Sequence, residues 1–244
     1  MMRETGMKLD LSRAWSDAMA ILGSQRDLLI AIAGVFLLMP TLVMNILRPM
    51  DIAQGLPPVE ALELWIDSNW PYLVLSALIA ALGRLAVLIL LLAPERPTVA
   101  EALSAGLRLL PIFVIANILV GLMLFAGTLL LILPGLYLAG RTLLAEVTLV
   151  AERLSNPVAA ITRSLSVTRG NGWRIFAMAA IIYVAGFVVT GLANAIVAVI
   201  QLVAGAGDVT SFLGALVSAL FGAGVTLVLL LVTIAIYRQL APQG

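Results

Sequence analysis

Three ionisable side chains interrupt the long apolar runs of this sequence: Arg84, Arg141 and Glu146. If these runs cross a lipid bilayer, such charges are costly, and they face either a partner of opposite charge or a watery cavity. Arg141 and Glu146 are five residues apart, so they lie on different faces of one helix. Glu146 is therefore better placed to pair with another helix, and Arg84 is the obvious candidate.

Two arrangements of these three residues are open. In the first, Arg84 and Glu146 neutralise each other while Arg141 reaches the outer interface or a backbone carbonyl. In the second, Arg84 and Arg141, with Glu146 nearby, flank a cavity that receives an anionic group such as a lipid phosphate. Guanidinium groups suit this role because they bind phosphate through two parallel hydrogen bonds.

A basic cluster with one aromatic residue follows the fourth apolar run and consists of Arg153, Arg163, Arg169, Trp173 and Arg174. Such a cluster could hold the anionic headgroups of membrane lipids. It could equally be the positive charge that sets the orientation of a membrane protein. The candidate headgroup contacts are Arg163, Arg169, Trp173 and Arg174.

The residue types that most catalytic and metal sites require are missing. The chain has no histidine and no cysteine, and it lacks the phosphate-binding GxxxxGK[ST] motif. Glu146 is the only acidic residue inside an apolar run. We therefore expect no catalytic activity, no metal and no cofactor. The formal net charge of +1 gives no reason to expect a nucleic-acid partner.

The composition predicts an integral membrane protein. Hydrophobic residues make up 62% of the 244 residues and charged residues 11%, whereas a soluble domain carries about 25% charged residues. A bilayer core about 30 Å thick requires roughly 20 helical residues. The expected fold is a single all-α transmembrane domain of six helices, a polytopic bundle. The six candidate runs are Leu28–Leu47, Tyr72–Ala93, Pro111–Leu133, Leu136–Ala151, Ile175–Ala204 and Ser211–Tyr237.

The distribution of basic residues supports six crossings. The first run begins only near Leu28, which is not typical of a cleaved signal peptide. With the N-terminus in the cytoplasm, eleven of the fourteen basic residues fall on that side, as the positive-inside rule demands. Without a crossing at Leu136–Ala151, the basic cluster would lie outside. Six crossings return the chain to the side on which it starts, so both termini are expected in the cytoplasm. The eleven residues are Arg3, Lys8, Arg13, Arg26, Arg96, Arg108, Arg153, Arg163, Arg169, Arg174 and Arg238.

Each pair of predicted spans follows a short helix with recognisable caps. Asp10 is placed to cap the first, and Thr98 with Glu101 forms a capping box for the second. Asn156 is placed to cap the third, which Gly170 is placed to end. Three copies of interfacial helix, outward span and inward span indicate a pseudo-threefold repeat, although any hairpin protein needs amphipathic connectors.

Two further patterns concern connections and packing. The Leu133–Gly135 sequence, Leu-Pro-Gly, predicts a tight outer turn between spans three and four. Pro58 is expected to begin a short separate amphipathic helix in the outer loop before span two. A stripe of small residues along the last run predicts close helix packing within the bundle: Gly214, Ser218, Gly222 and Thr226.

The block from Leu133 to Phe176 resembles the YciC-like family of bacterial inner-membrane proteins. It is also similar to the membrane domain attached to some glycerophosphodiester phosphodiesterases. The resemblance implies a six-helix inner-membrane protein and favours a structural contact between Glu152 and Arg163. It implies no phosphodiesterase activity, which belongs to a separate histidine-containing domain in those fusions. The segments that carry it are Leu133–Tyr137 (LPGLY), Arg141, Glu152, Ala160–Ser164 (AITRS), Val167–Gly170 (VTRG) and Trp173–Phe176 (WRIF).

Two functions fit these features. The first is a scaffold or accessory protein of the cell envelope, with membrane lipids, other membrane proteins or a second copy of itself as partners. The alternative is a transporter or binding protein for a lipid or small anionic amphiphile. Only the alternative requires a cavity between spans two and four, lined by Arg84 and Arg141. The sequence by itself favours the first.

Overall fold

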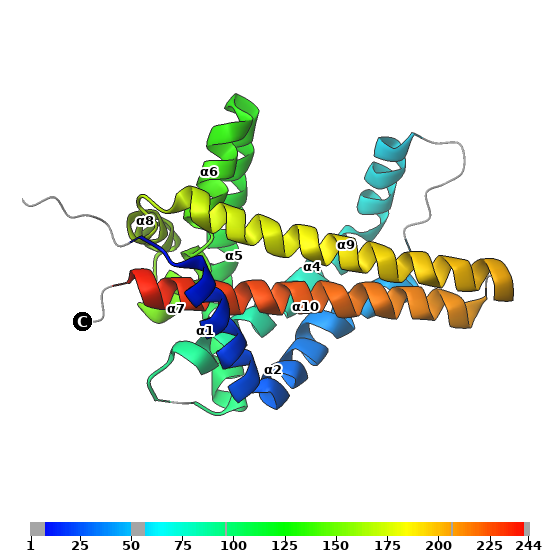
Figure 1. Ribbon diagram of the computed structural model, residues 1–244, viewed down its shortest axis with the longest axis horizontal. Coiled ribbons are helices and arrows are strands. Elements are labelled where there is room, and N and C mark those ends of the chain that lie inside the picture. The colour runs from blue at the N-terminus through cyan, green and yellow to red at the C-terminus, as the bar shows by residue number, and fades with distance from the viewer. Residues whose placement is uncertain (1–7, 50–56, 96, 206, 242–244) are drawn as a thin grey trace, which may run out of the picture.

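The computed structural model describes residues 8–49, 57–95, 97–205 and 207–241, and the regular elements in these ranges are all helices (Figure 1). Within these ranges, six helical stretches are long and apolar enough to cross a membrane, so the expected all-α polytopic bundle is confirmed. Arg3 and Arg96 lie outside the described residues. The elements are α1 (Leu11–Ser24), α2 (Arg26–Ala33), the π-helix η1 (Gly34–Leu38), α3 (Met39–Leu47), α4 (Pro58–Leu92), α5 (Val99–Leu130), α6 (Ile132–Thr142), α7 (Ala145–Ala151), α8 (Pro157–Val167), α9 (Gly172–Ala204) and α10 (Asp208–Leu240).

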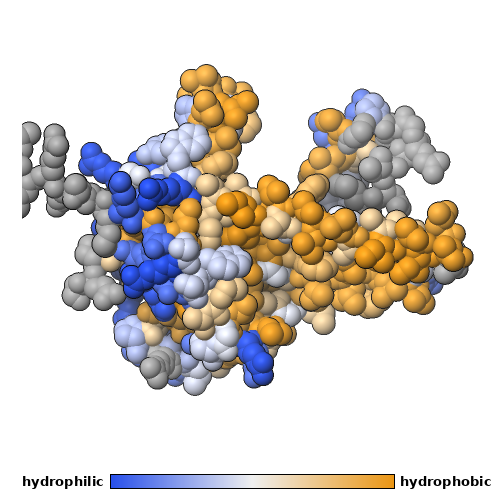
Figure 2. Space-filling view, viewed as in Figure 1, coloured by the Kyte–Doolittle hydropathy of each residue, from blue (hydrophilic) through white to orange (hydrophobic). Residues whose placement is uncertain are grey.

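The last helix, α10, is the central element of the bundle. Its most apolar window is 56% buried, against 11% for α5, and α9, α1 and α3 all pack against it. The α5–α6 and α9–α10 hairpins point in different directions from a shared base near α7 and α8 (Figure 1). Hydrophobic residues cover both hairpins, whereas hydrophilic residues gather near the base and the chain ends (Figure 2).

The first span is interrupted by η1 because of a proline. Pro40 has no N–H to donate, and its ring would collide with the carbonyl of residue 36 in a regular α-helix. The wider π-helical turn just before it relieves this conflict. The hydroxyl of Thr41 donates to the carbonyl oxygen of Leu37 at 3.0 Å and satisfies one acceptor of the irregular turn.

Two predicted helix boundaries are wrong. The helix that begins at Pro58 does not end before span two but continues through Pro71 as the single helix α4. The capping box at Thr98 likewise opens a helix, α5, that runs through Pro111 without a break. A proline inside a helix costs about 3 kcal/mol, and long flanking segments that are helical and packed outweigh this cost. The second copy of the supposed repeat therefore has no separate interfacial helix.

The connection between α5 and α6 also differs from the predicted turn. The chain reverses at Leu131, which is extended, and α6 begins directly at Ile132. Pro134 fits inside the first turn of α6, where backbone N–H groups have no helical partner. Gly135 has no left-handed backbone. It lies where a methyl group would overlap Thr128 of α5, so it permits close packing of the two helices.

The three predicted helix caps are confirmed. The carboxylate of Asp10 accepts from the backbone N–H of residue 13 at 3.1 Å. Thr98 and Glu101 form the reciprocal capping box, and the Asn156 side chain accepts from residue 158 at 2.9 Å. Gly170 follows α8 with φ of +80°, a backbone conformation that favours glycine. These local signals place the starts of α1, α5 and α8 where the sequence predicts a helix to begin.

The small-residue stripe of α10 is only partly used for packing within the chain. Ser218 exchanges hydrogen bonds with Asn194 of α9, the shorter at 3.0 Å, and Gly214 approaches Val197. Gly222, by contrast, is exposed and has no neighbour within 4 Å of an added Cβ among the described residues. The predicted packing within the bundle is therefore present at the first half of the stripe.

Candidate functional site

The fourth span is broken, and the break sends its two charged residues to different neighbours. Helix α6 ends at Thr142 and α7 begins at Ala145, with a turn between them. The hydroxyl of Thr142 donates to its own helix at the carbonyl of Leu138, 2.9 Å away. Arg141 lies before the break and Glu146 after it.

Glu146 pairs with Arg84, as predicted. Nη1 of Arg84 in α4 donates to Oε1 of Glu146 at 2.8 Å. The guanidinium carbon also lies 5.2 Å from the centre of the Phe113 ring in α5, a cation–π distance. The side chains are 29% and 19% exposed, and the buried Nε of Arg84 has no hydrogen-bond partner among the described residues. The pair is thus partly open and only partly satisfied.

The open side of this pair faces a cavity of about 400 Å³. Residues of α4, α5, α6, α7, α9 and α10 line it, and Arg84 and Glu146 are the only charged ones among the described lining residues. Tyr183 of α9, which is 56% exposed, lies at its rim, so the cavity reaches the surface. The apolar part of the wall comes mainly from Phe113, Val120, Leu124, Leu143, Leu229 and Leu230.

Arg141 does not line this cavity. Its guanidinium group donates to the carbonyl oxygen of Leu165 and, at 3.3 Å, to the hydroxyl of Thr168. Its own carbonyl oxygen accepts from Ser164 at 2.7 Å and from Thr168 at 3.1 Å. Arg141 therefore fastens α8 to α6. Of the two arrangements left open by the sequence, the first is confirmed in its contacts, and a site with both arginines is not formed.

A close backbone approach holds the same two regions together. A methyl group on Gly140 of α6 would overlap the carbonyl oxygen of Gly172 and lie 2.9 Å from the backbone nitrogen of Phe176. Gly172 in turn lies against the side chains of Tyr137 and Arg141. Only glycine at both positions lets α6 and the start of α9 come this close.

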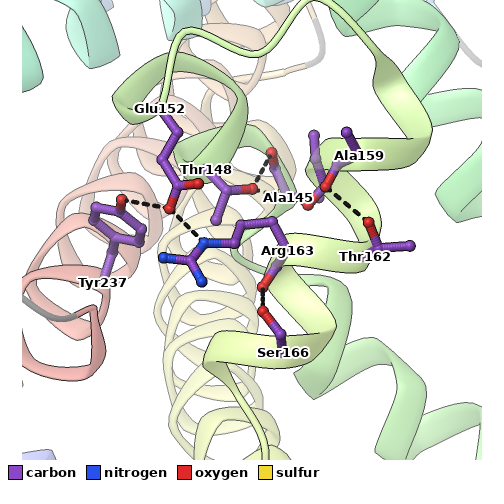
Figure 3. A network of polar contacts seen from close by, with 9 residues as sticks. Ala145, Thr148, Glu152, Ala159, Thr162, Arg163, Ser166 and Tyr237 are labelled. Atoms are coloured by element: carbon purple, nitrogen blue, oxygen red, sulfur yellow. Dashed lines mark hydrogen bonds and ion pairs between the residues drawn. The ribbon is translucent and has the colours of Figure 1, made fainter.

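Glu152 joins three elements at the base of the bundle (Figure 3). Its Oε1 accepts from Nε of Arg163 in α8 at 2.6 Å and from the hydroxyl of Tyr237 in α10 at 3.0 Å. Nearby, the hydroxyl of Thr148 donates to the carbonyl oxygens of Ala145 and Ala160. The expected contact between Glu152 and Arg163 is confirmed, and it ties α8 to the end of the fourth span and to α10.

The predicted headgroup-contacting residues separate into two kinds. Arg163 is engaged with Glu152, and Arg174 donates to the backbone carbonyl of Leu9 at 3.1 Å. Arg169 is exposed, and its guanidinium group has no ion-pair or hydrogen-bond partner within the described part of the chain. Trp173 is half exposed, and its ring contacts those of Tyr137 and Phe176 at centroid distances of 5.8 and 6.1 Å.

The N-terminal segment is fastened to the base of the bundle. The backbone N–H of Leu9 donates to Oδ1 of Asn171 at 3.0 Å, and the Leu9 carbonyl accepts from Arg174. The Leu9 side chain is buried, and α1 packs against α10. At the other end of the chain, Arg238 donates to the Leu91 carbonyl of α4 at 2.8 Å. The Gln239 side chain contacts the backbone of Asp10, so both described ends of the chain lie at the same end of the molecule.

Sequence reasoning missed several residues of these sites. Phe113 and Tyr183 line the cavity, but an aromatic residue in an apolar helix carries no signal of such a role. Thr226 also lines the cavity, whereas its place in the sequence indicates only a packing stripe. Tyr237 is 85 positions from its partner Glu152, and nothing local to either residue indicates the contact.

No model of a known protein family matches the chain, and no curated protein or solved structure matches it either.

Proposed function

We propose that this protein binds an amphiphilic molecule in the cavity beside Arg84 and Glu146, as a non-catalytic multi-pass protein of the bacterial inner membrane. One observation carries the proposal. The cavity lies within the membrane-spanning bundle and combines an apolar wall with a charged pair that is only partly satisfied. An amphiphile combines an apolar part and a polar part in one molecule, so it matches both the apolar wall and the charged pair.

The polar end of the cavity has unused hydrogen-bonding capacity. A guanidinium carries five N–H donors and a carboxylate two acceptor oxygens. Arg84 and Glu146 form one hydrogen bond between them, and neither has another hydrogen-bond partner in the described ranges. Within a bilayer, unsatisfied polar groups are costly because lipid tails cannot satisfy them. A polar headgroup in the cavity would satisfy them.

The apolar wall favours a ligand with a hydrocarbon part. The apolar side chains of Val120, Leu124, Leu143, Leu229 and Leu230 all line the cavity. A volume of about 400 Å³ falls within the range of small-molecule sites, whose lining is mostly apolar with a few polar groups. A water-soluble ion would gain nothing from this wall. An acyl chain is compatible with this wall, because lipid tails and leucine side chains are similarly apolar.

The cavity favours binding over the scaffold role, since a scaffold has no need of a partly satisfied charge pair inside the membrane. The resemblance of residues 133–176 to the YciC-like family supports the inner-membrane location. The asymmetric distribution of arginine supports cytoplasmic termini. The contact between the Gln239 side chain and the backbone of Asp10 agrees with two termini on one side.

Native mass spectrometry of the purified protein tests the proposal. We expect the wild-type protein to retain an amphiphile, and Val120→Trp to lose it because the indole fills the cavity. Ile118→Trp is the matched control, since Ile118 lies on the same helix but is 56% exposed and does not line the cavity. Equal retention by Val120→Trp and Ile118→Trp would show that any bound molecule lies elsewhere.

A further inference from the structure

We infer that the headgroup bound in this cavity is zwitterionic, with an anionic group that contacts Arg84 and a primary ammonium that contacts Glu146. The inference rests on the proposed function and specifies the class of ligand. A phospholipid whose head joins a phosphate to a primary amine has this chemistry. This ligand class differs from the anionic group that the sequence suggests for a cavity flanked by both Arg84 and Arg141.

The charge of the cavity argues against an anion. Arg84 and Glu146 are the only charged residues among its described lining residues, and their charges cancel. An anionic headgroup could bind Arg84 only by competing with Glu146, which would leave an unpaired carboxylate in a site of low dielectric constant. Leaving one member of a buried pair without its partner is strongly unfavourable. A cationic headgroup meets the converse problem with Arg84.

A zwitterion avoids both problems. Its phosphate can accept from the guanidinium nitrogens of Arg84 that Glu146 does not use, and its ammonium can donate to the carboxylate oxygen that Arg84 does not use. The total charge of ligand and cavity stays at zero. The 2.8 Å contact between Arg84 and Glu146 can then persist within a four-charge cluster of alternating sign.

The neutral polar residues of the cavity select the kind of cation. Asn117 donates its amide to the Phe113 carbonyl at 3.0 Å, which leaves its side-chain oxygen as an acceptor. The hydroxyls of Thr226 and Thr233 likewise donate to carbonyls of their own helix, so that their oxygens can accept. All three residues line the cavity. Acceptors suit a primary ammonium, which has three N–H donors, and offer nothing to a quaternary ammonium, which has none.

Lipid competition in nanodiscs tests the inference. The full-length protein would be reconstituted with equal amounts of phosphatidylethanolamine, phosphatidylglycerol and phosphatidylcholine with identical acyl chains, and the lipids retained on release would be counted by native mass spectrometry. We expect the wild-type protein to retain phosphatidylethanolamine over each of the others by about tenfold, the effect of one charge-assisted hydrogen bond. Val120→Trp should lose this retention.

Two variants reverse or weaken the preference in different ways. Glu146→Gln gives the cavity a net positive charge, so it should favour phosphatidylglycerol. Asn117→Leu leaves the charged pair intact and removes an acceptor, so phosphatidylethanolamine should lose part of its advantage over phosphatidylcholine even if Glu146→Gln fails to fold.

The outcomes separate the inference from the proposed function. Retention that depends on Val120 but prefers phosphatidylglycerol, or does not discriminate among headgroups, would overturn the zwitterionic headgroup and leave the binding function standing. Failure of the wild-type protein to retain any lipid in a Val120-dependent way would overturn both.

Discussion

Arg84 of α4 and Glu146 of α7 form an ion pair at 2.8 Å beside a cavity, although 62 positions separate them in the chain. The pair joins the second span, in α4, to α7, which is the part of the broken fourth span that follows the break. Each side chain would be an unpaired charge inside the membrane without the other. The contact therefore supports the fold and at the same time provides the polar end of the cavity.

A double-mutant cycle should reveal this coupling. We expect Arg84→Gln and Glu146→Gln each to lower the free energy of unfolding by about 2 kcal/mol, because each leaves the remaining charge unpaired. The double variant should be less destabilised than the sum of the two by about 1 kcal/mol or more. Unfolding in mixed micelles, followed by circular dichroism, provides the measurement. Additive losses would mean that the two side chains stabilise the protein independently.

The contact of Gly140 with Gly172 predicts a strong effect of one methyl group. Gly140→Ala should destabilise the protein by about 2 kcal/mol, because the overlap is with backbone atoms that cannot move aside easily. Gly121→Ala is the control, since no described residue lies within 4 Å of an added Cβ there. It should be neutral or stabilising by up to about 1 kcal/mol, as expected for alanine in a helix. Equal melting temperatures of the two variants in detergent would contradict the close approach.

The Glu152 network predicts local loosening of α8. Glu152→Ala removes the acceptor of both Arg163 and Tyr237, and Tyr237→Phe removes one donor. We expect losses of about 1 kcal/mol for Tyr237→Phe and more for Glu152→Ala, with faster hydrogen exchange of the α8 amides. Arg169→Ala should leave the exchange unchanged, because the Arg169 side chain is exposed and has no partner in the described part of the chain. A similar increase in hydrogen exchange in Glu152→Ala and Arg169→Ala would show that the contacts of Glu152 do not specifically stabilise α8.

The cap of α1 predicts a dependence on pH. Hydrogen bonds from the Ser12 hydroxyl and the backbone N–H of Arg13 hold the pKa of Asp10 below its ordinary value of 3.8. The stabilisation is therefore complete above pH 3.8 and is lost as the pH falls through the lower pKa of the folded protein. Protection factors of the α1 amides should decrease in that acidic range and recover on neutralisation. Asp10→Asn should retain a cap and lose this pH dependence; an unchanged profile would contradict the role of the carboxylate.

Local features of the sequence were sufficient for much of this structure. The six apolar runs and the caps at Asp10, Thr98 and Asn156 depend on neighbouring residues, so they could be predicted. The partner of Glu146 could also be predicted, because a charge at that depth requires an opposite charge and few are available.

Other features depend on a balance between opposing free energies or on a contact between residues that are far apart in the sequence. Helix α4 continues through Pro71 because the packing of the flanking helical segments stabilises it by more than one proline destabilises it. The sequence does not show which of these two free energies is larger. Arg141 binds α8 rather than a ligand because α8 docks beside it, which is a tertiary relationship. The cavity itself is lined by residues of six helices, so no single segment of the sequence indicates it.

Photo-crosslinking is the most direct test of the central claim that the cavity holds an amphiphile. A phosphatidylethanolamine with a diazirine close to its headgroup would be incorporated into membranes that contain the wild-type protein, and the crosslinked residues would be identified by peptide mass spectrometry. We expect crosslinks at cavity residues such as Val120 and Leu143. Crosslinks confined to outward-facing residues such as Ile118 and Phe125 would contradict the account.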